Sequence, residues 1–287
     1  MSVTKVVKVL QNSRKHWVGD GFYVSTLWSP GTSIYKYTNP FLMLDFAAPM
    51  NFSPTSKRRG VGVHPHRGFE TVTFALEGEV EHRDSSGGGG IIKPGGVQWM
   101  TAASGVVHDE FHSEEFSQRG GDFSMIQLWV NLPAKLKMSE PKYQGVEARD
   151  FPVVKEKNHE VKVIAGKYKG VEGPCSTNSP INILEVNFSK SGLFKYSCAD
   201  NMTTIALIIK GEVVISNQKY APEQGLVLAK DGEEYEVPAV NGSKLLILSG
   251  EPIDEPVESY GPFVMNTKEE LVQAVEDFNA NRMGNLS

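Results

Sequence analysis

The chain has 287 residues, of which 40% are hydrophobic and 22% are charged, as is ordinary for a globular protein. Its formal net charge of −5 argues against general electrostatic binding of nucleic acid, which needs clustered Lys and Arg. The only two cysteines, Cys175 and Cys198, exclude a disulfide scaffold, and the absence of Cys-x-x-Cys excludes a zinc ribbon. This length accommodates two domains of about 100–150 residues each.

The N-terminal residues 1–5 lack the apolar stretch of a secretory signal, and the sequence contains no run of 18 apolar residues. We therefore expect a protein that crosses no membrane and resides in a reducing, intracellular compartment. That compartment is the cytoplasm, or also the nucleus if the source is eukaryotic. We further expect a monomer.

Short β-like segments separated by turns fill the first half of the chain. The expected strands are Lys5–Val9, Phe22–Thr26, Phe41–Phe46, Glu70–Leu76, Val80–Asp84, Val97–Thr101 and Met125–Leu132. The segment Ala47–Gly60 is rich in Pro, Ser and Lys and is expected to be a loop. Ser85–Gly90 ends in four glycines and is expected to be a hairpin tip, because it lacks the Lys-Ser/Thr of a phosphate-binding loop.

The β pattern restarts near Val153 and continues almost to the end. An apolar segment followed by Gly-Glu-Val occurs twice, at Gly78–Val80 and at Gly211–Val213, which indicates two copies of one β unit. Short strands at such regular spacing favour a sandwich or a barrel. The one clear helix follows Asn266 and Thr267, which are expected to cap its N-terminus.

Two pairs of potential metal ligands flank the most regular β-like region. His64 and His66 lie two positions apart on an extended segment and therefore point to the same face. His108 and Glu110 repeat this spacing. If the two segments face each other, three imidazoles and one carboxylate can bind one ion and leave one or two coordination positions open. This ligand set suits Fe(II), Mn, Co, Ni, Cu(II) or Zn.

The other histidines are expected outside the site. His82 has no histidine at spacing two and lies in a charged strand, so we expect it at the surface. His112 shares the parity of His108 but leads into a segment that resembles a loop exit. His16 and His159 have polar neighbours in the sequence and are expected to be exposed.

Several segments resemble the signature of the pirins, which are members of the cupin superfamily. The resemblance rests on His64–Thr73, Gln98–Ala102 and His108-x-Glu110, and it continues in Gln127–Pro133, Gly250–Pro252 and Gly261–Thr267. It implies an all-β bicupin: two tandem cupin β-barrels of the double-stranded β-helix type, with a short C-terminal α-helix. Residues 1–135 would form the metal-binding barrel. Residues 136–287, with the helix, would form a barrel without a metal site, because no histidine follows His159.

The resemblance also implies a cofactor and an activity. One mononuclear divalent metal, usually iron and expected as Fe(II), would be bound by His64, His66, His108 and Glu110. The implied activity is that of a quercetin 2,3-dioxygenase, in which O2 opens the heterocycle of a flavonol and carbon monoxide is released. Glu110 would then be the catalytic base that takes the proton of the flavonol 3-hydroxyl.

Five residues are candidates for the substrate pocket. Asp45 interrupts an apolar strand, where a carboxylate is either structural or orients a ligand. Arg67 is a candidate anchor for a substrate oxygen, or else forms a surface salt bridge. Phe69, Phe74 and Trp99 are candidate walls for a flat aromatic substrate, although each also suits the core.

A second hypothesis follows from the same resemblance. The protein would be a redox-sensing regulator whose metal reports its oxidation state to a transcription factor or a metabolic enzyme. An exposed acidic or apolar patch beside the metal would favour this role. Direct binding of nucleic acid is not expected, because the sequence has no basic stripe and no DNA-binding motif.

Overall fold

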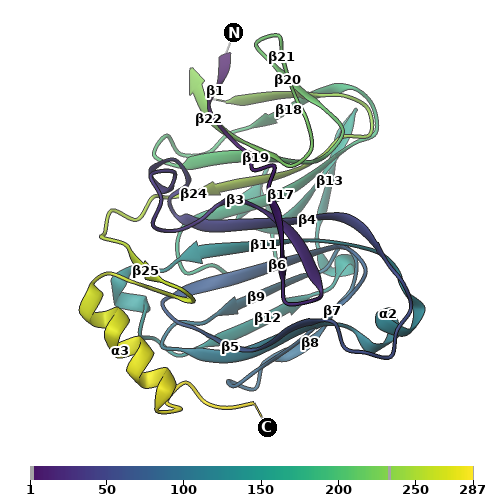
Figure 1. The fold of residues 1–287 in the computed structure, drawn as a ribbon. Coiled ribbons are helices and arrows are strands. Elements are labelled where there is room, and N and C mark those ends of the chain that lie inside the picture. Colours follow the sequence, from purple (N-terminus) through teal and green to yellow (C-terminus); the bar gives the residue numbers. More distant parts are fainter. Residues whose placement is uncertain (1–2, 232–233, 287) are drawn as a thin grey trace. The chain divides into compact units, whose positions relative to one another are not determined.

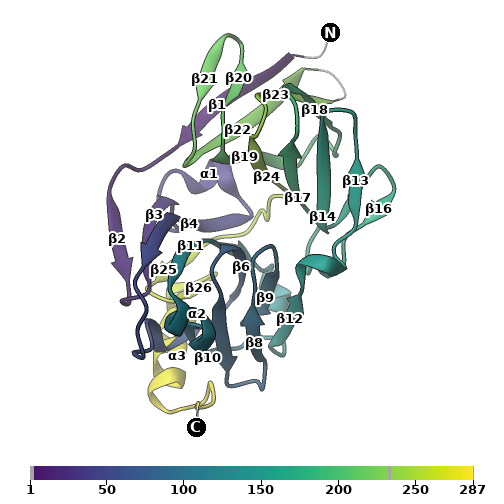
Figure 2. The same ribbon diagram turned by 90° about the vertical axis from the view of Figure 1, so that its right-hand side faces the viewer.

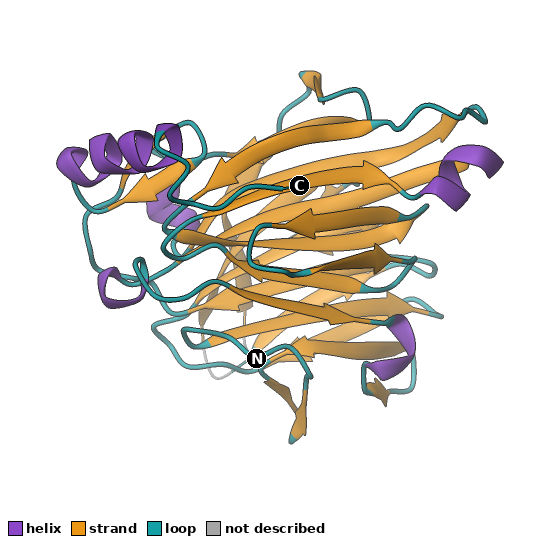
Figure 3. Cartoon of the chain, turned by 90° about the horizontal axis from the view of Figure 1, so that it is seen from below, coloured by secondary structure: helices purple, strands orange, loops and turns teal. Residues whose placement is uncertain are grey.

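A computed structural model of the chain describes residues 3–231 and 234–286. Strands make up most of the regular structure, and three α-helices and two short 3-10 helices occur among the described residues (Figures 1 and 3). No helix in these ranges is both long and apolar enough to cross a membrane. The contacts divide the chain into two compact units, and neither of them is one continuous segment.

The first unit consists of Ser13–Tyr35, Phe41–Ala148 and Ile253–Ser287. It contains two antiparallel sheets. The seven-stranded sheet has the order β12 (Lys142–Val146), β9 (Val97–Thr101), β6 (Phe69–Glu77), β11 (Gly121–Asn131), β4 (Phe41–Phe52), β3 (Phe22–Trp28) and β2 (Lys15–Val18). The four-stranded sheet has the order β5 (Gly60–His66), β10 (Val106–His112), β7 (Val80–Asp84) and β8 (Gly89–Ile92). Figure 2 shows β6, β9 and β12 side by side.

Helices occupy the margins of this unit. α2 (Glu114–Arg119) begins at Ser113, whose hydroxyl accepts the amide of Phe116. α3 (Lys268–Asn279) begins at Thr267, which caps it as expected, and Glu270 completes a capping box. The apolar face of α3 packs against the hairpin of β25 (Glu258–Tyr260) and β26 (Phe263–Met265). Figure 1 shows the helix beside β25.

The second unit consists of Met1–Asn12, Lys36–Pro40 and Arg149–Pro252. Its seven-stranded sheet has the order β1 (Val3–Leu10), β22 (Gln224–Asp231), β19 (Thr203–Lys210), β24 (Lys244–Gly250), β17 (Ile181–Phe188), β14 (His159–Ala165) and β13 (Val153–Lys155). Its four-stranded sheet has the order β18 (Gly192–Tyr196), β23 (Tyr235–Ala239), β20 (Val213–Ile215) and β21 (Gln218–Tyr220). Inward-facing aromatic and branched side chains of both sheets form one core.

The shorter elements complete the described chain. They are α1 (Tyr35–Thr38), the 3-10 helices Ala134–Leu136 and Ala148–Asp150, and the small hairpin of β15 (Lys167–Tyr168) and β16 (Val171–Glu172).

The repeated Gly-Glu-Val motif has the same structural role in both units. β6 passes through Gly78 into β7, and β19 passes through Gly211 into β20, in each case from the seven-stranded to the four-stranded sheet. Both glycines have positive φ, 74° and 82°, which residues with a Cβ rarely adopt. The prediction of two copies of one β unit is therefore confirmed.

Three differences from the sequence-based expectations concern the extent and grouping of the elements. β4 extends to Phe52 and so takes up part of the segment expected as a loop. α1 and α2 were not expected. The unit boundaries also differ from the expected ranges 1–135 and 136–287, since β1 pairs with β22 of the second unit and α3 belongs to the first. Strand pairing and apolar contacts decide this grouping, and they do not follow chain order.

Candidate metal centre

β5 and β10 bring the two predicted ligand pairs together. The strands are antiparallel neighbours, and His108 lies directly opposite His64. Side chains in such opposed positions have Cβ atoms about 4.5–5.5 Å apart. A register shift follows His108, so that Glu110 lies opposite Val61. The two ligand pairs thus meet on neighbouring strands of one sheet, and not on strands that face each other.

The three histidines form a compact group. The ring centroids of His64 and His108 are 4.2 Å apart, those of His66 and His108 are 4.8 Å apart, and those of His64 and His66 are 4.9 Å apart. One nitrogen from each ring lies within 4.8 Å of the other two. His82, His108 and Glu110 meet the same distance limit, so His108 connects the carboxylate to the three-histidine group.

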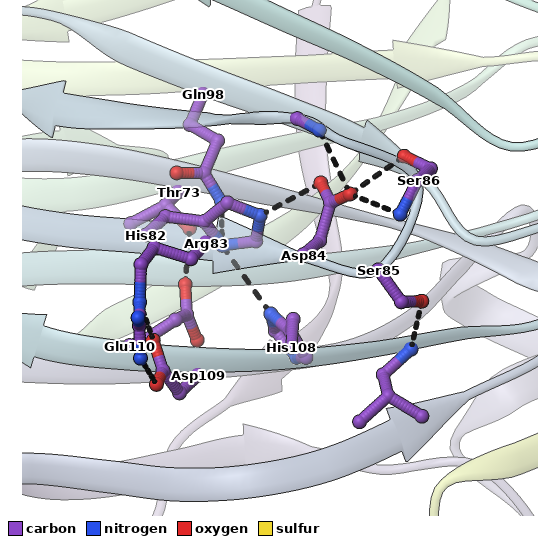
Figure 4. A network of polar contacts seen from close by, with 12 residues as sticks. Thr73, His82, Arg83, Asp84, Ser85, Ser86, Gln98, His108, Asp109 and Glu110 are labelled. Carbon is purple, nitrogen blue, oxygen red and sulfur yellow. Dashed lines mark hydrogen bonds and ion pairs between the residues drawn. The ribbon is translucent and has the colours of Figure 1, made fainter. Parts of the chain in front are cut away.

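Each of these three rings has its Nδ1 facing another group. Nδ1 of His64 is 2.8 Å from the carbonyl oxygen of Gly62, and Nδ1 of His66 is 3.4 Å from that of Pro262. Nδ1 of His108 is 3.3 Å from Nδ1 of His82 (Figure 4). Nε2 of His108 is buried and has no hydrogen-bond partner among the described residues. Buried polar atoms rarely lack a partner, so this nitrogen fits a metal ligand.

The electrostatic environment also suits a metal. Burial lowers the pKa of His66 and of His108 well below the ordinary value, and the neighbouring histidines act in the same direction. Both rings are therefore neutral at pH 7, which is the form that donates a lone pair to a metal. Three imidazoles and a carboxylate match the donor preferences of divalent transition metals, and the cluster could hold such an ion.

Glu110 is held from the opposite sheet. Its side chain is buried, and the hydroxyl of Thr73 on β6 lies 3.3 Å from Oε1 of Glu110. The same hydroxyl lies 2.6 Å from Oε1 of Gln127 on β11. The carboxylate is thus positioned by polar groups of the seven-stranded sheet.

A cavity of about 340 Å³ adjoins this cluster, a size within the usual range of small-molecule sites. Its polar lining comes from His64, His66, Glu110, Asp45 and Gln127. Its apolar lining consists of Val18, Phe22, Val24, Met43, Val61, Met125, Trp129 and Pro262. Such a cavity suits a largely apolar ligand that carries a few polar groups.

Asp45 is the carboxyl group in this cavity that is not part of the histidine cluster. Its side chain is mostly buried and accepts a hydrogen bond of 2.5 Å from the Thr26 hydroxyl. Burial raises the pKa of Asp45, although that hydrogen bond opposes the shift. Of the five pocket candidates from the sequence, Asp45 is the one that lines the cavity.

The other four pocket candidates lie outside the cavity lining. Arg67 is buried, and its guanidinium donates to the carbonyl oxygen of Ser104 and to Asp277, so it does not face a substrate. Phe69 packs against Trp129 at a centroid distance of 4.2 Å. Phe74 and Trp99 are buried core residues. Phe69, Phe74 and Trp99 thus fit the core alternative, whereas Arg67 forms a salt bridge that is buried and not at the surface as expected.

The expectation that His82 lies at the surface is wrong. Its side chain is fully buried, and its Nε2 lies 3.1 Å from Oδ2 of Asp84. Tyr143 stacks on the ring at a centroid distance of 5.2 Å. Glu81 and Arg83 alternate with the inward-facing Val80, His82 and Asp84, and the apolar Val80, which shares the parity of His82, was the signal that could have revealed this.

His112 and His159 are also buried. His112 lies within a group of phenylalanines and donates through Nε2 to the carbonyl oxygen of Gly21, and burial lowers its pKa to about 4. It belongs to neither metal-competent group. His159, expected to be exposed, is buried in the second unit beside Phe188. His16 is exposed as expected.

Comparison with known proteins identifies relatives along nearly the whole chain. The family model named Pirin matches residues 24–130, and the model named Pirin C-terminal cupin domain matches residues 183–284. A protein of Pseudomonas aeruginosa named "Putative quercetin 2,3-dioxygenase PA2418" is 46% identical over 97% of this chain and 98% of its own. A "Pirin-like protein" of Caulobacter vibrioides is 37% identical over 98% of this chain and 100% of its own.

A solved structure agrees with these matches. The crystal structure of a quercetin 2,3-dioxygenase from Acinetobacter baumannii superposes with a TM-score of 0.93 at 45% identity, over 99% of this chain and 100% of that one. The predicted all-β fold with two cupin domains and a short C-terminal helix is thereby confirmed. The chain belongs to the pirin family of cupin proteins.

Proposed function

We propose that this protein is a mononuclear metal enzyme of the quercetin 2,3-dioxygenase type, which opens the heterocycle of a flavonol with O2 and releases carbon monoxide. The proposed ligands are His64, His66, His108 and Glu110, and the expected metal is Fe(II). The observation that carries the proposal is the buried, unpartnered Nε2 of His108 in a histidine cluster that borders a ligand-sized cavity. The names of the relatives from P. aeruginosa and A. baumannii support the same reaction class.

The cavity accounts for binding of a flat aromatic substrate. Trp129, Phe22 and Met125 provide apolar surface for the rings and exclude water from them. A bound metal would supply a Lewis acid for the flavonol oxygen and a redox partner for O2. The apolar walls leave the polar ends of the substrate to the few polar groups of the lining.

Glu110 is the proposed base for the flavonol 3-hydroxyl. Its carboxylate is buried at the border of the cavity, and Thr73 limits its rotation through the contact at Oε1. A positioned carboxylate that accepts this proton would contribute about 10²–10⁴-fold to the rate. The proton then resides on a carboxylate oxygen of Glu110.

Asp45 and Gln127 are the proposed polar contacts for the remainder of the substrate. Both line the cavity without belonging to the proposed ligand set. The carboxyl group of Asp45 lines the cavity and can form a hydrogen bond with a polar group of the substrate. The amide of Gln127 can donate as well.

The test is an assay of the Fe(II)-loaded protein with quercetin, with and without O2. We expect loss of the flavonol absorbance together with an equal amount of carbon monoxide, only when O2 is present. Glu110→Gln should lower turnover per bound metal by at least about 10²-fold, while the half-exposed Glu81→Gln on β7 should not. If no carbon monoxide forms with Fe, Mn, Co, Ni, Cu or Zn, the reaction is wrong. If Glu110→Gln turns over normally per bound metal, Glu110 is not the base.

A further inference from the structure

A second set of buried polar side chains lies directly behind His108. β7 pairs with β10 so that Asp84 is opposite His108 and His82 is opposite Glu110. His82 is fully buried and lies between three partners: Asp84 at Nε2, and Gln98 and His108 at Nδ1 (Figure 4). None of these contacts has a role in the function proposed above.

Asp84 is fixed as a hydrogen-bond acceptor by the hairpin that follows it. Its Oδ1 accepts from the amide of Ser86 at 2.8 Å, the hydroxyl of Ser86 at 2.6 Å and the amide of Gly88 at 3.0 Å. Burial would raise the pKa of Asp84, but hydrogen bonds from His82, Ser86 and Gly88 lower it to about 2. The ionised carboxylate only accepts, so Nε2 of His82, 3.1 Å from Oδ2, bears a proton.

Gln98 points to the same tautomer from the other side of the ring. Its side-chain Nε2 lies 2.9 Å from Nδ1 of His82, and an amide nitrogen can only donate. Nδ1 of His82 is therefore an acceptor, in agreement with the proton on Nε2 that Asp84 requires. Two independent contacts thus specify one state of a neutral ring.

The state of His82 determines that of His108. The two Nδ1 atoms lie 3.3 Å apart, and Nδ1 of His82 bears no proton. Without a proton on Nδ1 of His108 two lone pairs would face each other, so His108 donates and shares the lone pair of His82 with the Gln98 amide. A neutral His108 with its proton on Nδ1 has a lone pair on Nε2. That nitrogen is the buried atom without a partner.

We propose that Asp84, His82 and Gln98 are positioning residues that hold His108 in the tautomer with the proton on Nδ1 and so make its Nε2 a metal donor. This inference rests on the proposed metal site. His64 and His66 have backbone carbonyls at Nδ1, so His108 is the proposed histidine ligand whose tautomer is set by side chains. Loss of such outer partners typically weakens metal affinity by about 10–100-fold.

The first test reads the tautomers directly in the metal-free wild-type protein. Long-range proton–nitrogen NMR spectra of ¹⁵N-histidine-labelled protein distinguish protonated from unprotonated ring nitrogens. We expect His108 with its proton on Nδ1 and His82 with its proton on Nε2. A proton on Nε2 of His108 would overturn the proposal. The spectrum requires neither flavonol nor turnover, so it is independent of whether the proposed reaction is correct.

The second test measures affinity for Co(II) and Zn(II) by competition with a chromophoric chelator. Asp84→Asn can present an amide donor to Nε2 of His82, which would favour the opposite tautomer of His82 and hence of His108. His82→Phe removes the nitrogen that accepts from Nδ1 of His108. Both should bind metal about 10–100-fold more weakly. His82→Gln keeps a carbonyl acceptor and should recover most of the affinity.

Asp109→Asn is the matched control for Asp84→Asn. Asp109 lies between His108 and Glu110 in sequence, but its carboxylate accepts from Arg83 on the other face of the sheet. Its replacement should leave metal affinity unchanged. Wild-type affinity in folded Asp84→Asn and His82→Phe proteins would contradict the proposal. If those variants do not fold, the wild-type NMR spectrum still decides it.

Discussion

Nη1 of Arg67 lies 2.7 Å from Oδ2 of Asp277, and this ion pair joins the residue after His66 to the last helix of the chain. The guanidinium is almost completely buried, and its Nε also donates to the carbonyl oxygen of Ser104. A buried cation that loses its partner is costly. The pair therefore couples the stability of α3 to the position of the segment that bears His64 and His66.

Asp277→Asn should destabilise the protein by about 2 kcal/mol, since it weakens the pairing of a buried guanidinium. The wild-type effect depends on pH. Burial alone would raise the pKa of Asp277, but hydrogen bonds from Arg67, Gln273 and Arg282 bring it from 3.8 to about 2. As the pH falls, Asp277 is protonated in the unfolded chain at a higher pH than in the folded protein. The stabilisation is therefore present above about pH 4 and is lost as the pH falls towards 2.

Urea unfolding between pH 7 and pH 2.5 would measure this effect. The difference in the free energy of unfolding between wild type and Asp277→Asn should be constant near neutrality and shrink below pH 4. Glu276→Gln is the control, because Glu276 is the exposed neighbour on the same helix. A difference that does not change with pH would show that the charge of Asp277 is unimportant.

Lys137 is a buried ammonium that donates three hydrogen bonds. Its Nζ lies 2.7 Å from the carbonyl oxygen of Gly68, 2.7 Å from Oδ1 of Asn131 and 3.0 Å from the carbonyl oxygen of Val264. Burial lowers its pKa to about 8, so the amine is still mostly charged at pH 7. It ties the start of β6 to the end of β11 and to β26.

Lys137→Met should therefore lower the free energy of unfolding by about 3 kcal/mol, because three buried acceptors lose their donor while the side-chain volume is kept. Thermal and urea unfolding would measure the loss. Lys135→Met, at an exposed position two residues earlier, is the matched control and should change stability little. Equal stabilities of the two variants would refute the role of Lys137.

Local sequence patterns were enough to predict many of the strands and to identify the two pairs of proposed metal ligands. The bounds expected for β7 and β9 are those observed, because the strand-forming residues and the turns that flank them are local features of the sequence. The spacing of His64 with His66, and of His108 with Glu110, is likewise local, but the pairing of the two strands that brings them together was only assumed.

What the sequence did not reveal depends on contacts between distant segments. His82 looked exposed because its neighbours Glu81 and Arg83 are charged, yet β10 and Tyr143 cover its side chain. The assignment of α3 to the first unit comes from packing against β26, and that of β1 to the second unit comes from pairing with β22. No single segment contains that information.

Asp45→Leu tests the polar contact proposed for the substrate. It removes the carboxyl group from the cavity at similar side-chain volume, so anaerobic quercetin binding should weaken by about 10-fold, the value of one hydrogen bond. Metal content should not change, because Asp45 is in neither metal-competent group. Asp122→Leu, at an exposed position on β11, is the control. An unchanged quercetin Kd in Asp45→Leu would remove Asp45 from the pocket.

Gly88→Ala tests the link between the glycine-rich hairpin and the metal without altering any polar side chain. A Cβ at Gly88 would collide with Oδ2 of Asp84 and would lie 2.6 Å from Cβ of Tyr143, so the carboxylate must move away from His82. We expect a lower melting temperature and a metal affinity about 10-fold weaker, as when a residue that hydrogen-bonds to a metal ligand is lost. Gly62→Ala is a stringent control on β5, since a Cβ there meets nothing within 4 Å. Gly62 lies only two residues from the proposed ligand His64. If Gly62→Ala nevertheless keeps its metal affinity while Gly88→Ala loses affinity, the loss is due to the displaced carboxylate of Asp84. Equal affinities in both variants would mean that the position of Asp84 does not influence the metal.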